Sequence, residues 1–153
     1  MNKESIEFEK TASYLLVRVA TAFKTAFEKH MAEIHLHGGQ AWVLIELWNE
    51  DGLKQIELAT RLNLSAPTVN KIVKGLIDIN LVTLERSDGD GRSTRIFLTD
   101  QGWDKREDVE AQWHDLEAYC LAGVTEGEKW ALMELLRKLK NTYHPDESTD
   151  EDE

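Results

Sequence analysis

One stretch decides the fold: Leu62-Asn-Leu-Ser-Ala-Pro-Thr-Val-Asn-Lys71, which continues to Asn80. Its apolar residues recur at the period of an α-helix. Ser65 is a good N-cap and Pro67 suits a first turn, so we expect a helix over residues 66–79. Asn80 stands where such a helix stops.

The residues on either side of this helix complete a recognisable unit. A short helix is expected before it, over residues 54–62. After it, Leu81-Val-Thr-Leu-Glu-Arg86 alternates with the period of a β-strand, and residues 92–98 indicate a second strand behind the turn cluster of residues 87–91. Two short helices, a tight turn and a β-hairpin form a winged helix-turn-helix, which we place over residues 40–99.

The chemistry of the second helix favours DNA as its partner. In such a unit this helix buries one face and leaves the other free for the major groove. Asn70 and Thr68 carry hydrogen-bonding tips for base edges, lysines pair with phosphates, and the free N–H groups at the helix start can donate to a phosphate. The residues expected outward are Ala66, Thr68, Asn70, Lys71 and Lys74, and those expected inward are Val69, Ile72, Val73 and Leu76. The alternative is an ordinary surface helix with a solvated polar face.

The tip of the hairpin supplies a second candidate contact. Gly89 and Gly91 allow the loop to extend, and Arg92 stands at its edge with Asp90 nearby. A guanidinium on a narrow loop suits the minor groove, and a neighbouring carboxylate can hold it in one orientation. The alternative is a solvated turn.

The charge is unevenly distributed along the chain. The net charge is −11 over 153 residues, yet residues 54–98 contain seven basic and five acidic residues. This mildly basic middle is either chance or one face that meets a polyanion. Residues 146–153 carry six acidic side chains and no basic one, so we expect a disordered, solvated tail.

Helices on both sides of the winged unit predict a dimer. An apolar stripe over residues 5–36 indicates one long helix, which we expect Gly38-Gly39 to end. Helical patterns also cover residues 103–143, with Thr125 and Glu128 spaced as a capping box. These helices carry more apolar surface than one lobe can cover, so a two-fold homodimer is expected.

The sequence lacks the signatures of other classes of protein. A single cysteine, Cys120, leaves no disulfide framework and no CxxC zinc site, and we expect it to be a buried small residue. No nucleophile–base motif or phosphate-binding loop is found, so no enzyme activity and no cofactor are predicted. No apolar run is long enough for a bilayer and the first ten residues do not form a signal peptide, so we expect a cytoplasmic protein with no membrane partner.

Several short motifs resemble one family of proteins. Gln55-Ile-Glu-Leu-Ala59, residues 62–71, Asp90-Gly-Arg92 and Leu98-Thr-Asp-Gln-Gly102 are similar to the motifs of the MarR family of bacterial transcriptional regulators. The likeness is close over the DNA-binding lobe, and beyond it only the layout and length of the helices agree. It implies a mainly α fold with a small β wing, in which a winged helix-turn-helix lobe and a helical dimerisation lobe form one domain over residues 1–145.

The resemblance also implies a function. Members are homodimers that bind a pseudo-palindromic operator in double-stranded DNA, and repression is usually relieved by a ligand or by oxidation. It places Ser65, Pro67, Thr68, Asn70 and Lys71 on the recognition helix and Asp90 and Arg92 on the wing. With the other outward or basic side chains, the candidate DNA contacts are Ser65, Ala66, Pro67, Thr68, Asn70, Lys71, Lys74, Arg86, Asp90, Arg92 and Arg95. Asn80 and Gly91 depart from the family pattern, which usually has Gly at the first position and often a second Arg at the other.

The resemblance further implies an effector site. A cleft is expected where the first, second and fifth helices meet, and its candidate lining is Phe27, Met31, His37, Trp42 and Trp103. Such a concave, mostly apolar site suits a small aromatic effector. Two alternatives stay open. Either His30, His35 and His37 make a regulator of the same fold responsive to zinc, or the winged helix contacts another protein and not DNA.

Overall fold

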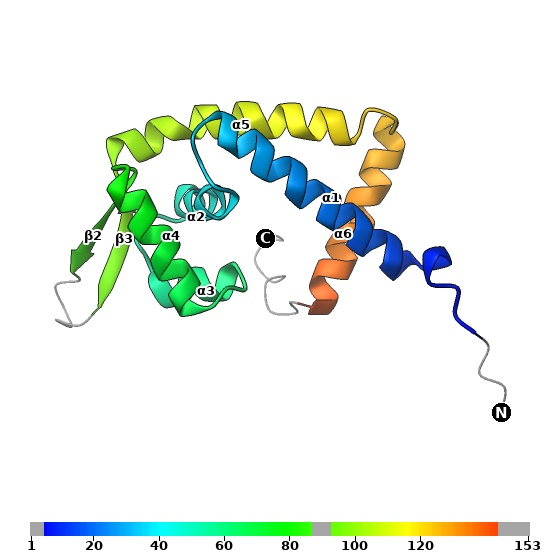
Figure 1. Ribbon diagram of the computed structural model, residues 1–153, viewed down its shortest axis with the longest axis horizontal. Coiled ribbons are helices and arrows are strands. Elements are labelled where there is room, and N and C mark those ends of the chain that lie inside the picture. Colours follow the sequence, from blue (N-terminus) through cyan, green and yellow to red (C-terminus); the bar gives the residue numbers. More distant parts are fainter. Residues whose placement is uncertain (1–4, 87–92, 144–153) are drawn as a thin grey trace, which may run out of the picture. The chain divides into compact units, whose positions relative to one another are not determined.

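The computed structural model describes residues 5–86 and 93–143 of the chain. These residues are mainly helical with one small antiparallel sheet, as predicted (Figure 1). Asp90, Arg92 and the acidic tail over residues 146–153 lie outside the described residues. The elements, in chain order, are the 3₁₀ turn η1 (Phe8–Lys10), α1 (Ala12–Glu33), α2 (Gly38–Asn49), β1 (Leu53–Lys54), α3 (Gln55–Arg61), α4 (Ala66–Asp78), β2 (Val82–Arg86), β3 (Thr94–Leu98), α5 (Asp100–Cys120) and α6 (Glu126–Tyr143).

The chain divides into two compact units, Met1–Leu116 and Glu117–Glu153. The first unit contains the helix-turn-helix, the sheet and α1, and the second contains α6. Within the described residues, no helix combines the length and the apolar character that crossing a membrane requires.

The helix α1 is shorter than the one predicted over residues 5–36. It begins after Thr11, whose hydroxyl accepts a hydrogen bond from the Tyr14 amide over 3.2 Å. Thr11 has extended backbone angles (φ −92°, ψ 143°), so the 3₁₀ turn before it does not continue into the helix. The local capping bond therefore decides the helix start, and the apolar spacing of the preceding residues does not.

The other end of α1 also differs from the prediction. His35 adopts a left-handed conformation (φ 61°), and the amides of His35 and Leu36 donate to the carbonyls of Ala32 and Met31. This Schellman arrangement ends the helix before the two glycines are reached. The prediction that Gly38-Gly39 ends α1 is wrong, because these glycines form the first turn of α2.

Two side chains explain why a helix can begin at these glycines. The Gly38 amide donates to the Glu28 carboxylate over 2.9 Å. The His37 amide donates to Oε1 of Gln40, also over 2.9 Å. Two amides that a helix N-terminus leaves without a partner are thereby satisfied.

The helix-turn-helix has the boundaries that its sequence indicates. Ser65 caps α4 by accepting from the Thr68 amide over 3.3 Å, and Asn80 ends it at φ 60°. Asn63 ends α3 in the same left-handed conformation, at φ 51°, and starts the tight turn into α4. Asparagine adopts this conformation more readily than most residues, so both helix ends are encoded locally.

The apolar face of α4 packs into the core of the first unit. Val69 and Leu76 have no exposed surface, Val73 is 4% exposed, and Ile72 is half-buried. The helix packs against α2, α3 and β2. Other side chains buried in the same core are Met31, Leu44, Leu47, Leu53, Leu58, Ile96 and Leu116.

The sheet contains a strand that the sequence did not indicate. β1 is two residues long and pairs with β3 in antiparallel register, Leu53 opposite Ile96 and Lys54 opposite Arg95. β2 pairs with the other edge of β3, so the strand order is β1-β3-β2. A two-residue strand has no measurable period, which is why only its pairing with β3 identifies it.

Asp51 ties this sheet to the end of α2. Its Oδ1 accepts from the Leu98 amide over 2.9 Å and from the Gly52 amide over 3.0 Å. The Arg95 guanidinium in turn donates to the Gly52 carbonyl over 2.8 Å. Gly52 has φ 77°, a conformation that favours glycine. These bonds determine where the hairpin leaves the core.

The start of α5 lies against the turn that follows α4. The Thr99 hydroxyl accepts from the Gly102 amide over 3.0 Å and donates to the Asn80 carbonyl over 2.7 Å. The Trp48 indole donates to the Gly102 carbonyl over 3.1 Å. A Cβ atom added at Gly102 would collide with the backbone carbonyl of Leu81. Only glycine fits at the last position of the Leu-Thr-Asp-Gln-Gly motif.

The second unit confirms the predicted capping box. The Thr125 amide and hydroxyl both donate to Oε2 of Glu128 over 2.9 Å, and the hydroxyl accepts from the Glu128 amide over 3.3 Å. The hydrogen bond from the Thr125 backbone lowers the pKa of the Glu128 carboxyl below its usual value. This pair marks the first turn of α6.

Cys120 does not have the buried position that we expected. The buried residues of α5 are Gly102, Val109 and Leu116. Cys120 lies one turn beyond the last of them and is exposed. The prediction is wrong because the buried positions of α5 end at Leu116.

We expect Gly102→Ala to lower the free energy of unfolding by about 1–3 kcal/mol, the usual cost of overpacking a well-packed site. The added methyl group meets the Leu81 carbonyl, so the backbone must shift. Urea unfolding followed by tryptophan fluorescence measures the change. Gly127→Ala is the control, because a Cβ added there has no neighbour within 4 Å and alanine favours a helix. Equal losses from both substitutions would contradict the packing argument.

Asp51→Ala removes the acceptor for the Leu98 and Gly52 amides. We expect it to lower the free energy of unfolding by about 1–3 kcal/mol, because the part-buried Leu98 amide loses its acceptor, whereas the Gly52 amide keeps the Ile96 carbonyl. Asp51→Asn is the matched control, since the amide keeps an oxygen that can accept both bonds. Thermal unfolding of the two variants measures the difference. If Asp51→Asn destabilised the protein as much as Asp51→Ala, the charge of Asp51 and not its hydrogen bonds would be responsible.

Candidate nucleic-acid interface

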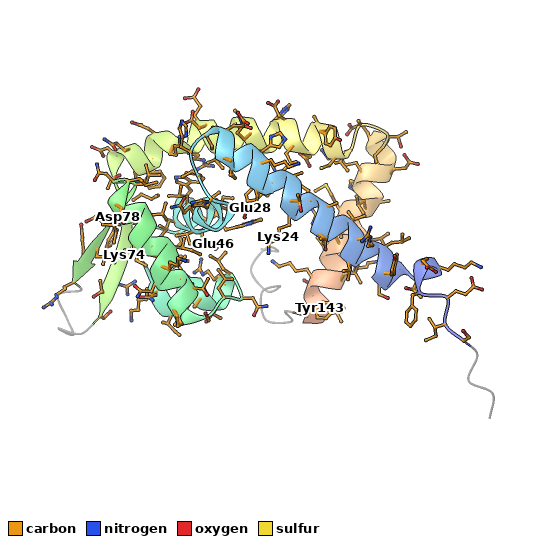
Figure 2. All side chains as sticks on the ribbon, in the orientation of Figure 1. Lys24, Glu28, Glu46, Lys74, Asp78 and Tyr143 are labelled. Carbon is orange, nitrogen blue, oxygen red and sulfur yellow. The ribbon has the colours of Figure 1, made fainter. Side chains whose placement is uncertain are left out.

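The outward face of α4 carries the side chains predicted to meet DNA. Because the opposite face is buried, the packing of the helix determines which side chains point outward. Seven of the predicted contacts on and just before this helix are exposed, namely Ser65, Ala66, Pro67, Thr68, Asn70, Lys71 and Lys74. Figure 2 shows Lys74 and Asp78 leaving α4 one turn apart.

The side chains at the start of α4 hold the helix in place. Oγ of Ser65 and Oγ1 of Thr68 lie 2.8 Å apart and share a hydrogen bond at the cap. Nε2 of Gln55 donates to the Ala66 carbonyl over 3.1 Å, which joins the start of α3 to the start of α4. Ser65 and Thr68 therefore already have partners within the protein.

The middle of α4 is different. No hydrogen bond or ion pair with another described residue engages the side chains of Asn70, Lys71 or Lys74. A carboxamide can donate to and accept from one base edge at the same time, and an ammonium group suits a phosphate. One carboxamide and two positive charges are thus available on this face for an external partner.

The β2–β3 hairpin lies beside α4 (Figure 1). Arg86 is exposed at the end of β2 and has no partner among the described residues. Arg95 is half-buried, donates to the Gly52 carbonyl and stands opposite Glu85 in the sheet. The two arginines, which the sequence placed in one group, therefore differ. Arg86 is available to a partner, whereas Arg95 holds the sheet together.

Arg61, which the sequence did not single out, ties the last turn of α3 to α2. Its guanidinium forms a close ion pair with Glu50 and lies 3.7 Å from Oε2 of Glu46. The hydrogen bond to Glu50 raises the pKa of Arg61 above its ordinary value. This contact holds the residues that lead into the recognition helix. No local pattern could reveal it, because its partners belong to another helix.

A cavity of about 610 Å³ is lined by residues of α1, α2 and the helix-turn-helix. Its volume lies in the range of small-molecule sites. Phe27 and Trp42, two of the predicted effector residues, line it, and their ring centroids are 5.5 Å apart. The lining is mostly apolar, with four charged side chains, Lys24, Glu28, Glu46 and Arg61. Figure 2 shows Lys24 and Glu28 on α1 and Glu46 on α2.

The other predicted effector residues do not line this cavity. Met31 has no exposed surface and belongs to the core, His37 is the residue before α2, and Trp103 is 44% exposed on α5. The helix α5 meets the aromatic pair through Trp113. Its ring centroid lies 5.6 Å from that of Phe27 and 5.5 Å from that of Trp42. Apolar spacing identifies the inward side chains but not those that face a hollow.

The histidines considered as zinc ligands have separate roles. Nδ1 of His30 lies 3.0 Å from Oε1 of Gln112. His35 ends α1 and His37 precedes α2. Across residues 5–86 and 93–143, no three His, Cys, Asp or Glu side chains gather into a group that could hold a metal ion.

The sequence matches the family model described as MarR family over residues 38–94. The HTH-type transcriptional regulator TtmR of Methylorubrum extorquens (strain PA1) is 30% identical over 131 residues, which are 86% of this chain and 66% of TtmR. The HTH-type transcriptional repressor IacR of Pseudomonas putida is 27% identical over 132 residues, which are 86% of this chain and 77% of IacR. The chain spans just under two thirds of the length of TtmR, and 62% and 60% of two relatives from Bacillus subtilis.

The fold is also found in solved structures. That of BpsR from Bordetella bronchiseptica agrees with a TM-score of 0.80, over 90% of this chain and 98% of the BpsR chain, at 20% sequence identity. At that identity the likeness concerns the fold. The family model covers α2, the helix-turn-helix and the hairpin up to the first residue of β3. Over residues 38–94, which include the helix-turn-helix, the sequence therefore matches the MarR family, and TtmR, a transcriptional regulator, is similar over most of this chain.

Proposed function

We propose that the protein is a homodimeric transcriptional regulator, a repressor that binds a pseudo-palindromic operator in double-stranded DNA and is released by a small-molecule effector. The observation that carries the proposal is the outward face of α4, where Asn70, Lys71 and Lys74 have no partner within the described residues. The comparisons support it, because residues 38–94 match the MarR family, and the similar proteins TtmR and IacR are named a transcriptional regulator and a transcriptional repressor.

The side chains of α4 divide into two roles on DNA. Asn70 reads a base edge in the major groove, where the carboxamide suits adenine. Lys71 and Lys74 pair with phosphates, and so does Arg86 from the end of β2. Ala66 and the Thr68 methyl group face thymine methyl groups, while Ser65 and Pro67 set the helix start. Arg95 acts on DNA only through the position of the sheet.

The wing completes the contact. Arg92 enters the minor groove beside the recognition helix, and Asp90 orients its guanidinium. This part of the proposal rests on the sequence, since both residues lie outside the described part of the chain. Arg86 and Thr94 face each other across the sheet and are the last described pair of β2 and β3 before these residues.

The apolar surfaces of α1 and α6 support a homodimer. Each helix exposes large apolar side chains to water in the single chain, and α6 has no buried residue. Surfaces of this kind mark interaction sites. On α1 the exposed residues are Tyr14, Leu15, Leu16, Val17 and Val19, and on α6 they are Trp130, Leu132, Met133, Leu135, Leu136, Leu139 and Tyr143. We assign both helices, with α5, to an isologous interface within one domain over residues 1–145.

The cavity supports the effector part of the proposal. Thr68 and Ile72 of α4 line it, so a ligand there touches the recognition helix directly. A coupling of only about 1–3 kcal/mol is enough to weaken operator binding several-fold or more. Regulation of the DNA binding of BpsR by 6-hydroxynicotinic acid is consistent with this kind of control.

We expect Asn70→Ala to lower the preference for the operator over random DNA by about 1–3 kcal/mol, because it removes a base contact. Lys74→Ala should weaken binding to both DNAs and reduce the salt slope by about one unit for one lost phosphate contact. Fluorescence anisotropy measures both effects, with a genomic fragment selected by the protein and a scrambled duplex, at several salt concentrations.

The control for this experiment is Lys29→Ala, an exposed lysine on α1 that is neither a proposed DNA contact nor one of the apolar residues assigned to the dimer interface. It should leave both affinities unchanged. Equal losses on operator and random DNA from Asn70→Ala and Lys74→Ala would contradict the division of roles. If no salt-dependent DNA binding were found, the winged helix would instead contact another protein.

Leu136→Glu should convert the dimer to a monomer at micromolar concentration, because a charge buried in an apolar interface is costly. Light scattering and sedimentation equilibrium measure the mass. Leu84→Glu is the matched control, since Leu84 is 49% exposed and Leu136 is 43% exposed, but Leu84 lies on β2. A monomeric unsubstituted protein would contradict the dimer directly.

A further inference from the structure

We propose that the cavity next to α4 takes an aromatic ligand that carries both an ammonium group and a carboxylate. This inference names the ligand class of the proposed effector site. It depends on the proposed function only for the consequence of binding on DNA, and the binding itself can be measured without DNA.

The cavity first offers aromatic surface. Phe23 and Phe27 stack with ring centroids 6.3 Å apart, and Phe27 meets the Trp42 ring at a tilt of 40°. Phe27 is only 2% exposed, whereas Trp42 is 38% exposed, so the indole is the open member of this pair. A planar aromatic ligand gains favourable offset or tilted contacts on such a surface.

Two of the four charged lining residues already have good partners. Arg61 forms its close ion pair with Glu50, which is not part of the lining. The Glu28 carboxylate accepts from the Gly38 amide over 2.9 Å. Neither charge needs a ligand.

The other two charged residues are less well satisfied within the described part of the chain. Lys24 has no hydrogen bond or ion pair with any residue that the structure describes. The side chain of Glu46 is 22% exposed, and among the described residues its one ion pair is the 3.7 Å approach to Arg61, which is longer than a hydrogen bond. A carboxylate with reduced access to water gains from a charged donor within hydrogen-bond distance.

The positions of these two charges define the ligand. Lys24 lies one turn before Phe27 on α1, and Glu46 lies one turn after Trp42 on α2, so each charged residue is one turn from one member of the aromatic pair. A simple aromatic acid would satisfy Lys24 and leave Glu46 with only its 3.7 Å contact to Arg61. A simple aromatic amine would do the reverse. Only a ligand with both groups meets both charges.

The test is isothermal titration calorimetry on the full chain without DNA. The ligands are 4-(aminomethyl)benzoate, with 4-methylbenzoate and 4-methylbenzylamine as its singly charged analogues of the same shape. The regioisomer 3-(aminomethyl)benzoate and L-phenylalanine cover other separations of the two charges. We expect a zwitterion to bind at least about ten-fold more tightly than either singly charged analogue, because one charge-assisted hydrogen bond contributes about that factor.

Two substitutions assign the charges to residues. Glu46→Gln should make the zwitterion and 4-methylbenzoate bind with similar affinity. Lys24→Gln should do the same for the zwitterion and 4-methylbenzylamine. Glu33→Gln and Lys29→Gln are matched controls on α1 outside the cavity lining, and should change neither ratio. Circular dichroism verifies that each variant is folded.

Two outcomes would overturn the proposal. One is binding of 4-methylbenzoate as tight as that of the zwitterions and unaffected by Glu46→Gln, which would indicate a simple acid site. The other is no binding by any of the five ligands. A second titration with operator DNA present tests the proposed function separately. A zwitterion that binds without changing the DNA affinity would support the ligand class and contradict operator release from this cavity.

Discussion

The burial of one face of α4 is the constraint on which the rest of the molecule depends. Val69, Val73 and Leu76 fill the core of the first unit, so the helix has one permitted rotation about its axis. A rotation by a single residue, about 100°, would bury Asn70 and expose Val69. Burying the Asn70 carboxamide without hydrogen-bond partners would cost free energy, and the loss of buried apolar contacts from Val69 would add to that cost. The direction of the candidate DNA-binding face is therefore a consequence of core packing.

Contacts at the start of α4 connect this face to the cavity. The Ser65 cap and the bond from Gln55 to the Ala66 carbonyl hold the helix start, and Arg61 holds the turn before it against α2. Arg61 and Thr68 also line the cavity. A ligand in the cavity would therefore touch residues that take part in positioning α4. The connection is a physical contact between neighbouring side chains and needs no longer pathway.

Local patterns were sufficient to predict the helix-turn-helix and much of its exposed face. A cap such as Ser65 and a helix end such as Asn80 depend on backbone groups only a few residues away, so neighbours in the sequence reveal them. The same holds for the capping box of Thr125 and Glu128. Once the start of α4 is known, the helical period separates its inward from its outward side chains. The family resemblance depends on these same local motifs.

Contacts between distant segments were decided only by the tertiary structure. β1 exists because Leu53 pairs with Ile96, and α2 begins at two glycines because Glu28 of another helix accepts the first amide. The cavity brings Lys24 and Glu46 together with the aromatic pair of Phe27 and Trp42. The sequence indicated the two aromatic residues but neither of the charged ones. Each of these contacts depends on where two separate elements lie in space. The period and the caps of one element carry no information about the other, so the sequence by itself determined the helices and their faces, and packing determined the site.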